Sequence, residues 1–342
     1  MIRVQNIYYM LSYAFSALQA TGYRSVATEE FENVSDLCAA ILIQGMNSQL
    51  KRGLARGYVE KTDTLSSPRG KIEVSASLRS QAYLRKELVC TYDEFSEDIY
   101  LNRVVKSTLL LLLREGNVSV ARCREIRRLL RFLTQVSPID IAHINWRFQY
   151  NRNNQTYRML IGVCELVVKG LLQTEADGTS RLMSFMDEQY MHRLYEKFLL
   201  EYYTRHHPEL SPRAAQIPWA LDDNVSALLP IMQTDITLQK GNHVLIIDAK
   251  YYSHATQQQF DKRSVHSGNL YQIFTYVKNA ALSAASHEVS GMLLYAKTDE
   301  EEISPHEYSM SGNRISVRTL DLSGDFEVIR GQLNDIAEKL LC

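Results

Sequence analysis

Two acidic residues and a lysine stand at the ends of two short apolar segments between residues 234 and 252, which read TDITLQKGNHVLIIDAKYY. Asp235 precedes the first segment, and Asp248 and Lys250 follow the second, which runs through Val244 and Ile247. Charges at the end of an apolar strand are costly unless they compensate one another or bind a metal ion. This cost makes the segment a candidate for chemistry.

We expect the two segments to form a β-hairpin in which Gly241 and Asn242 are the two-residue turn. That register places Asp235 directly opposite Asp248, with Cβ atoms roughly 4.5 to 5.5 Å apart. Because side chains alternate along a strand, Lys250 points to the same face as Asp248. The spacing therefore predicts that the three charged groups converge.

Two carboxylates that face each other repel unless a cation lies between them. Magnesium suits this position because it binds one or two protein carboxylates and keeps several waters. The carbonyl of Ala249 would lie near the same ion, so the expected metal ligands are Asp235, Asp248 and Ala249. Lys250 would orient or deprotonate a water that attacks a phosphodiester polarised by the metal. The alternative is a solvated salt bridge between Asp235 and Lys250; the apolar strand that runs into the pair favours the metal site.

The N-terminal part of the chain has the apolar spacing of helices. We expect them near residues 4–15, 34–52, 96–113, 120–133 and 156–172. From Gly57 to about Asp93 the period shortens, and the alternating KIEVSASL predicts a strand within a small β-element. Ser96 is the expected cap of the helix that follows. This part is therefore predicted to be helical with a small β-element.

The polar segment from Gln173 to Arg181 interrupts the apolar pattern, and we expect the domain boundary there, between residues 1–178 and 179–342. Helices and strands are interspersed after this segment, which predicts a mixed sheet flanked by helices. The expected fold class is α+β or α/β.

The composition excludes several classes of protein. The 342 residues carry a formal net charge of −1, which provides little sequence-independent affinity for DNA. Five cysteines without a C-x-x-C pair argue against a disulfide framework or a zinc site. No apolar run is long enough to span a membrane, and the start lacks the features of a secretory signal. We therefore expect a cytoplasmic protein that does not interact with membranes.

The hairpin and the helix that follows it resemble the PD-(D/E)xK nuclease core, including the Gln-x-x-x-Tyr helix of its RecB-like branch at Gln272 to Tyr276. Thr234 stands where the proline of that core would be. The chain is also similar to the McrC family, the nuclease subunits of McrBC modified-cytosine-dependent restriction systems. This similarity rests on NIYYMLSYAF, SPRGKIEVSASL, LNRVVKSTL, LLPIMQTDITL, LIIDAKYY and NLYQIFTYV, and it runs from residue 6 to near the C-terminus.

The resemblance assigns metal binding to Asp235 and Asp248 and the role of catalytic lysine to Lys250. It also implies an auxiliary acid on the helix that precedes the hairpin. Glu196, in a YExF arrangement, is the preferred candidate, and Glu201 is the other.

Gln272 would contact the metal-bound water or a phosphate. A helical glutamine is, however, more often a packing or hydrogen-bonding residue, so this alternative stays open.

The resemblance implies a magnesium-dependent DNA endonuclease of the type IV restriction class, acting in antiphage defence. Such a subunit would cleave methylated double-stranded DNA. It would act with, and stimulate, a GTP-hydrolysing McrB-type AAA+ ring on which its N-terminal domain docks. Two alternatives stay open: a stand-alone RecB-like repair or resolvase nuclease, and a regulatory adaptor of an NTPase. The intact acid, acid and lysine set argues against a pure adaptor.

Overall fold

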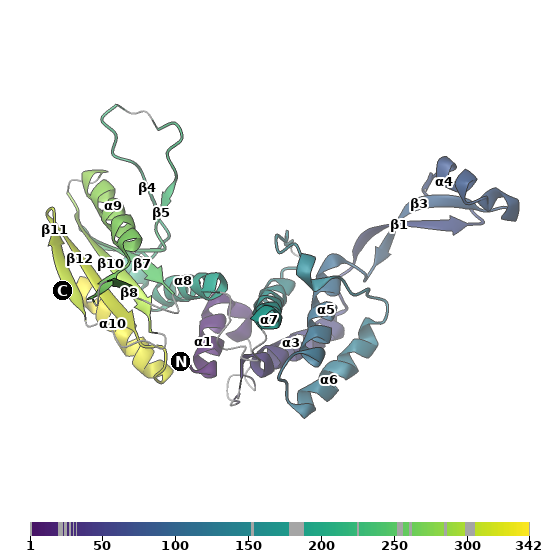
Figure 1. Ribbon diagram of the computed structural model, residues 1–342, viewed down its shortest axis with the longest axis horizontal. Coiled ribbons are helices and arrows are strands. Elements are labelled where there is room, and N and C mark those ends of the chain that lie inside the picture. The colour runs from purple at the N-terminus through teal and green to yellow at the C-terminus, as the bar shows by residue number, and fades with distance from the viewer. Residues whose placement is uncertain are drawn as a thin grey trace. The chain divides into compact units, whose positions relative to one another are not determined.

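The computed structural model (Figure 1) describes residues 2–19, 33–151, 154–177, 188–223, 226–251, 256–259, 262–283, 286–297 and 305–341, and the single residues 23, 26, 29 and 31. The chain divides into two compact units. Unit 1 comprises Met1–Glu32 and Met183–Cys342, and unit 2 comprises Asn33–Leu182.

This division differs from the expected 1–178 and 179–342, because the first helix belongs with the C-terminal residues. Helix α1, Val4–Ala14, has aromatic partners in unit 1. The ring of Tyr9 stacks on Phe326 with centroids 4.3 Å apart, and the Tyr13 hydroxyl lies 2.8 Å from Nε2 of His206. Periodicity alone could not reveal these contacts, which join residues about two hundred or more positions apart in the sequence.

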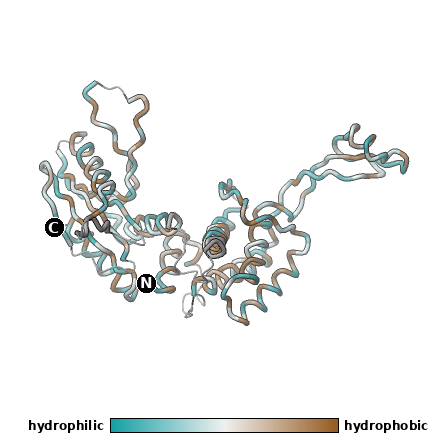
Figure 2. The backbone as a smooth tube through the Cα atoms, viewed as in Figure 1, coloured by the Kyte–Doolittle hydropathy of each residue, from teal (hydrophilic) through white to brown (hydrophobic). Residues whose placement is uncertain are grey.

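Four helices form the body of unit 2, with two short 3-10 turns. They are α3 (Val34–Arg52), α5 (Tyr100–Arg114), α6 (Val120–Leu130) and α7 (Tyr157–Asp177), with η4 (Arg131–Leu133) and η5 (Ile141–His143). Their apolar stripes are buried against one another, and Figure 2 shows hydrophobic stretches along them. The expected cap of α5 is wrong: Ile99 precedes the helix, and the Ser96 hydroxyl accepts from the amide of Asp98 instead.

An arm of three antiparallel strands extends from these helices (Figure 1). It contains β1 (Gly57–Leu65), β2 (Lys71–Ile72), α4 (Val74–Arg79), η3 (Ala82–Arg85) and β3 (Leu88–Ser96), and the strand order is β1-β3-β2. The arm confirms the expected β-element, but KIEVSASL is not one strand. The hydroxyl of Ser77 donates to the carbonyl of Glu73 and accepts from the amide of Val89, which holds residues 74–79 in a helical turn beside β3.

A five-stranded mixed sheet is the centre of unit 1. Its order is β11 (His306–Met310), β12 (Asn313–Leu320), β10 (Glu288–Ala296), β7 (His243–Lys250) and β6 (Ile236–Lys240). The three central strands are parallel, and both edge strands are antiparallel to their neighbours. The remaining elements are η1 (Ser16–Gln19), α8 (Glu188–His206), η6 (Pro208–Leu210), β4 (Gln216–Ile217), β5 (Met232–Gln233), β8 (Thr256–Gln259), β9 (Lys262–Val265), α9 (Ser267–Ser283) and α10 (Phe326–Leu341).

Helices cover both faces of this sheet. On one face Ile273 and Val277 of α9 pack against Ile246, Leu293 and neighbouring apolar residues. On the other face lie α8 and α10, which a hydrogen bond from the Tyr203 hydroxyl to the carbonyl of Leu333 joins at 3.2 Å. The expected α/β class, with a mixed sheet flanked by helices, is confirmed. Within the described ranges, no helix has both the length and the apolarity to cross a membrane.

Close packing of α9 on the sheet requires a glycine in β10. A Cβ at Gly291 would lie 2.8 Å from Cγ2 of Val277 and 2.9 Å from Cγ1 of Ile273. We expect Gly291→Ala to lower the free energy of unfolding by about 1–3 kcal/mol, because overpacking displaces the helix. Urea denaturation followed by circular dichroism measures the change.

Gly331→Ala in α10 is the matched control. No atom lies within 4 Å of the position that its Cβ would take, so alanine should raise the free energy of unfolding by about 0.5–1 kcal/mol through its higher helix propensity. Equal effects of the two substitutions would contradict the close approach at Gly291.

Candidate active site

The predicted hairpin forms with the predicted register. Strands β6 and β7 pair from Ile236 opposite Ile247 to the turn, where Gly241 has a φ of 58° in the left-handed region that favours glycine. Asp235 lies in the bend directly before β6, so the register continued by one residue places it opposite Asp248. The backbone therefore brings the two acids together at the end of the sheet where β7 ends.

Asp235 is held by the strand opposite it. Its Oδ2 accepts a hydrogen bond from the amide of Ala249 at 2.8 Å. The preceding Thr234, where the related core has proline, is buried; its hydroxyl accepts from the amide of Ala215 at 3.0 Å and lies 2.8 Å from that of Thr237. Hydrogen bonds thus fix the bend that a proline ring would otherwise restrict. Burial raises the pKa of Asp235, while the Ala249 amide and the charge of Lys250 lower it.

Asp248 is the most enclosed charge of the site, with 1% of its surface exposed. Its Oδ2 lies 2.8 Å from Nζ of Lys250, and the two groups form an ion pair. Within the part of the chain that the structure describes, its buried Oδ1 accepts no hydrogen bond. Burial raises the pKa of Asp248 to about 7; Lys250 lowers it, and the charge of Asp235 raises it. A buried carboxylate with unused lone pairs is costly unless another ligand compensates it.

Lys250 connects the strand to α9. Its side chain is buried on the face of β7 that carries Asp248, as strand alternation predicts, and Nζ donates to Oε1 of Gln272 at 3.1 Å. The Gln272 amide in turn donates to the Tyr276 hydroxyl, one helical turn later, at 3.0 Å. The glutamine and tyrosine of the sequence motif therefore form a chain of contacts that orients Lys250.

Glu196 on α8 lies in the electric field of this site, and its pKa is raised to about 7. Burial is the main cause, and the charges of Asp235 and Asp248 add to it, while Lys250 opposes them. His192, one helical turn earlier, lies 3.2 Å from a carboxylate oxygen of Glu196. The sequence analysis did not single out this histidine, although its spacing of four residues from Glu196 on one helix was a usable signal.

Glu201, the other candidate for the auxiliary acid, pairs with Arg205 at 4.0 Å along the helix. The charges of Asp235 and Asp248 raise the pKa of Glu196, whereas Glu201 is not among the groups that shift it. The structure therefore groups Glu196, and not Glu201, with the hairpin acids. The roles of these residues in a reaction stay predictions.

The donors at the site fit a hard divalent cation of the magnesium type. In the described ranges, no group of three or more histidine, cysteine, aspartate and glutamate residues could hold a metal ion, so a centre built wholly from such side chains is not present there. The carboxylates of Asp235 and Asp248 are oxygen donors of the site, and Oδ1 of Asp248 accepts no hydrogen bond within the described residues. Two carboxylates with waters suffice for magnesium. The amide of Ala249 contacts Asp235, and its carbonyl as a third ligand stays a prediction.

Comparison with known proteins identifies relatives over nearly the whole chain. Residues 4–296 match the family model described as McrBC 5-methylcytosine restriction system component. The chain is 29% identical over 345 residues to a protein of Escherichia coli (strain K12), the type IV methyl-directed restriction enzyme EcoKMcrBC, and the match covers 99% of this chain and 98% of that protein.

A solved structure shows the same fold. It is the half-complex of Thermococcus gammatolerans McrB AAA+ hexamers with bound McrC. The matched chain is 18% identical with a TM-score of 0.51, and the match covers 98% of this chain and 75% of that one.

The raised pKa of Asp248 predicts how stability depends on pH when a chelator excludes metal. The folded-state pKa is about 7, above the ordinary value of 3.8, so the stability linked to protonated Asp248 is complete below about pH 4 and is lost as the pH rises through about 7. Between about pH 4 and pH 7, we expect the free energy of unfolding to fall less steeply with pH in Asp248→Asn than in wild type. The two slopes should differ by up to about 1.4 kcal/mol per pH unit. Urea denaturation at several pH values in EDTA measures the slope.

Asp335→Asn, at an exposed position of α10, is the matched control and should keep the wild-type slope. The interpretation fails if Asp248→Asn and wild type lose stability in parallel from pH 4 to pH 8.

Proposed function

This chain belongs to the family of McrBC 5-methylcytosine restriction system components, and on that basis we propose that it is the magnesium-dependent endonuclease subunit of such a system. The observation that carries the proposal is the convergence of Asp235, Asp248 and Lys250 at one end of the sheet, where Oδ1 of Asp248 accepts no hydrogen bond within the described residues. The substrate would be methylated double-stranded DNA, as the description of the E. coli relative suggests.

Each residue of the site would have a separate role in phosphodiester hydrolysis. Asp235 and Asp248 would hold Mg²⁺, which supplies Lewis-acid polarisation of the scissile phosphodiester when it is bound. Lys250, held by Gln272, would orient the attacking water or take its proton. Glu196, with a pKa near 7, would exchange a proton with the water network at neutral pH. Each role uses a side chain that the fold holds in place before substrate binds.

We further propose that unit 2 docks on a GTP-hydrolysing AAA+ partner of the McrB type, because McrB accompanies McrC in the matched structure. The arm of unit 2 has the composition of a docking surface. Large apolar side chains that the unit leaves exposed there include Tyr58, Val74, Leu78, Leu84 and Phe95. Exposed apolar side chains that gather on one element mark interaction sites.

The charge of the chain supports the need for a partner. A formal net charge of −1 leaves little sequence-independent affinity for DNA, since that affinity comes mainly from cations that neutralise phosphates. We therefore expect the isolated chain to be a weak nuclease at physiological salt, and a partner to bring the DNA to it.

Removal of either hairpin acid should abolish cleavage. We expect Asp235→Ala and Asp248→Ala to lose detectable cleavage of methylated plasmid in the presence of the partner, GTP and Mg²⁺, because each loses a metal ligand. Asp335→Ala, which removes an exposed acid of α10, should cleave like wild type. Near wild-type cleavage by either hairpin variant would refute the assignment.

Lys250→Ala should retain metal binding and lose about 10²- to 10⁴-fold in cleavage rate, because positioned proton transfer typically contributes that much. Lys278→Ala on α9 removes a lysine that donates to the carbonyl of Ser311 and to Asn313, and should change the rate less than about twofold. Single-turnover cleavage and a magnesium titration separate the two effects. A loss below about tenfold would reassign Lys250 to a structural role.

Point substitutions should separate DNA cleavage by unit 1 from stimulation of the partner by unit 2. Leu78→Asp with Leu84→Asp on the arm should abolish stimulation of the partner's GTP hydrolysis, because carboxylates are costly in an apolar interface. Asp248→Ala should stimulate hydrolysis like wild type. Val120→Asp, at an exposed apolar position of unit 2 outside the arm, is the control. GTPase assays measure the stimulation, and pull-down of the partner measures binding. Full stimulation by the arm variant would contradict docking through the arm.

A further inference from the structure

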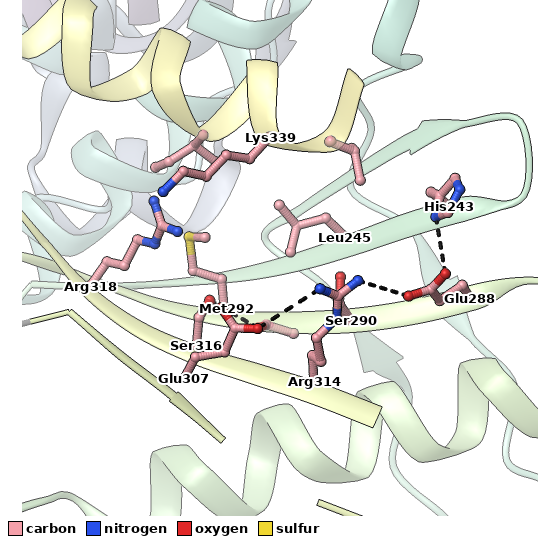
Figure 3. A pocket seen from close by; sticks show the side chains of 13 residues that line it. His243, Leu245, Glu288, Ser290, Met292, Glu307, Arg314, Ser316, Arg318 and Lys339 are labelled. Atoms are coloured by element: carbon pink, nitrogen blue, oxygen red, sulfur yellow. Dashed lines mark hydrogen bonds and ion pairs between the residues drawn. The ribbon is translucent and has the colours of Figure 1, made fainter. Parts of the chain in front are cut away.

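A cavity separate from the candidate active site lies in unit 1, on the face of the sheet that α10 covers (Figure 3). Its volume is about 410 Å³, within the range of small-molecule sites. Leu245 and Met292 line it, and they alternate along their strands with Ile246 and Leu293, which pack toward α9. Asp248 and Lys250 also point to the α9 side, so the cavity lies on the opposite face from the candidate active site.

Two cations from different elements point into the cavity. Figure 3 shows Lys339 of α10 extending toward the guanidinium group of Arg318 on β12. The Nε atom of Arg318 is buried and has no hydrogen-bond acceptor within the part of the chain that the structure describes. In the same ranges, no carboxylate forms an ion pair with Lys339 or Arg318. Like charges brought together at a partly enclosed site are unfavourable unless an anion joins them.

Arg314, the third cation of the cavity, is compensated. It lies 2.8 Å from a carboxylate oxygen of Glu288 and 3.9 Å from one of Glu307, as the dashed lines in Figure 3 mark. The cavity therefore has one end where Arg314 is paired with two acids and one end, at Arg318 and Lys339, with excess positive charge. Leu245, Met292 and Ile336 line the cavity with apolar surface.

We propose that this cavity binds a small phosphorylated ligand, with the phosphoryl group between Arg318 and Lys339 and an apolar portion against Leu245 and Met292. A phosphoryl group offers the oxygen acceptors that a guanidinium fork lacks here, and arginine binds such groups through two parallel hydrogen bonds. An apolar wall beside a phosphoryl site matches a nucleoside phosphate better than phosphate alone. The site does not depend on the proposed nuclease chemistry.

Calorimetric titration of the full chain, in a phosphate-free buffer with EDTA, tests the proposal with three probes. Inorganic phosphate should bind once per chain, GMP should bind at least as tightly, and guanosine, which lacks the phosphoryl group, should show no binding at the same concentration. Arg318→Ala should weaken phosphate and GMP by at least about tenfold, and Lys339→Gln by about threefold. Arg213→Ala, which removes an exposed arginine outside the cavity, should change neither by more than about twofold.

Arg318→Lys covers the case in which Arg318→Ala unfolds the unit. It keeps the charge, so it should fold and bind more weakly than wild type. Failure of wild type to bind phosphate and GMP, or equal binding by Arg318→Lys, Lys339→Gln and wild type, would overturn the proposal. Binding of duplex DNA that depends on Arg318 while both small probes fail would also overturn it, and would assign these cations to the DNA backbone.

The acidic run DEEE at residues 299–302 lies outside the described residues, and the test includes a variant in which all four are amides. This variant should bind phosphate within about fourfold of wild type, the allowance that the loss of four negative charges requires. If only this variant bound phosphate, the chain's own acids would be the partners of the two cations, and the proposal would be wrong.

Discussion

The buried pair of Asp248 and Lys250 is the constraint on which the arrangement of unit 1 depends. Two charges that are almost fully enclosed interact strongly with every polar group around them, and the fold places such groups there from three directions. The bend before β6 brings a second carboxylate opposite Asp248, α9 supplies the amide of Gln272 to Lys250, and α8 brings Glu196 into the same field. The hairpin, α9 and α8 are therefore coupled electrostatically through this one buried pair.

The sequence predicted the parts of this site that depend on local geometry. A two-residue turn sets the hairpin register, and alternation sets the face of each side chain, so Asp235, Asp248 and Lys250 converge from spacing alone. Contacts between elements required the structure. The choice of Glu196 over Glu201 depends on how α8 lies against the sheet, and the His192 contact depends on the rotamers of two long side chains on that helix.

Two errors of prediction have local causes, and a third has a cause distant in sequence. Alternating small residues in KIEVSASL fit a strand or a short helix equally well, and the hydrogen bonds of Ser77 decide for the helix. Ser96 has the side chain of a cap but bonds to a nearer amide. The boundary at residue 178 was close to the second junction, whereas the first junction was not predicted because the partners of α1 are distant in sequence.

The discontinuous unit 1 has a consequence for synthesis of the protein. Helix α1 is translated before unit 2, but the strands and helices that it packs with are translated only after the whole of unit 2. Unit 2 is continuous and completes its sequence earlier, so it can fold on the nascent chain while α1 waits, at about 5–20 residues per second. Strand β12 and helix α10 are translated after the hairpin of β6 and β7. A chain that ends before β11 would therefore lack two strands of the sheet that carries the hairpin acids.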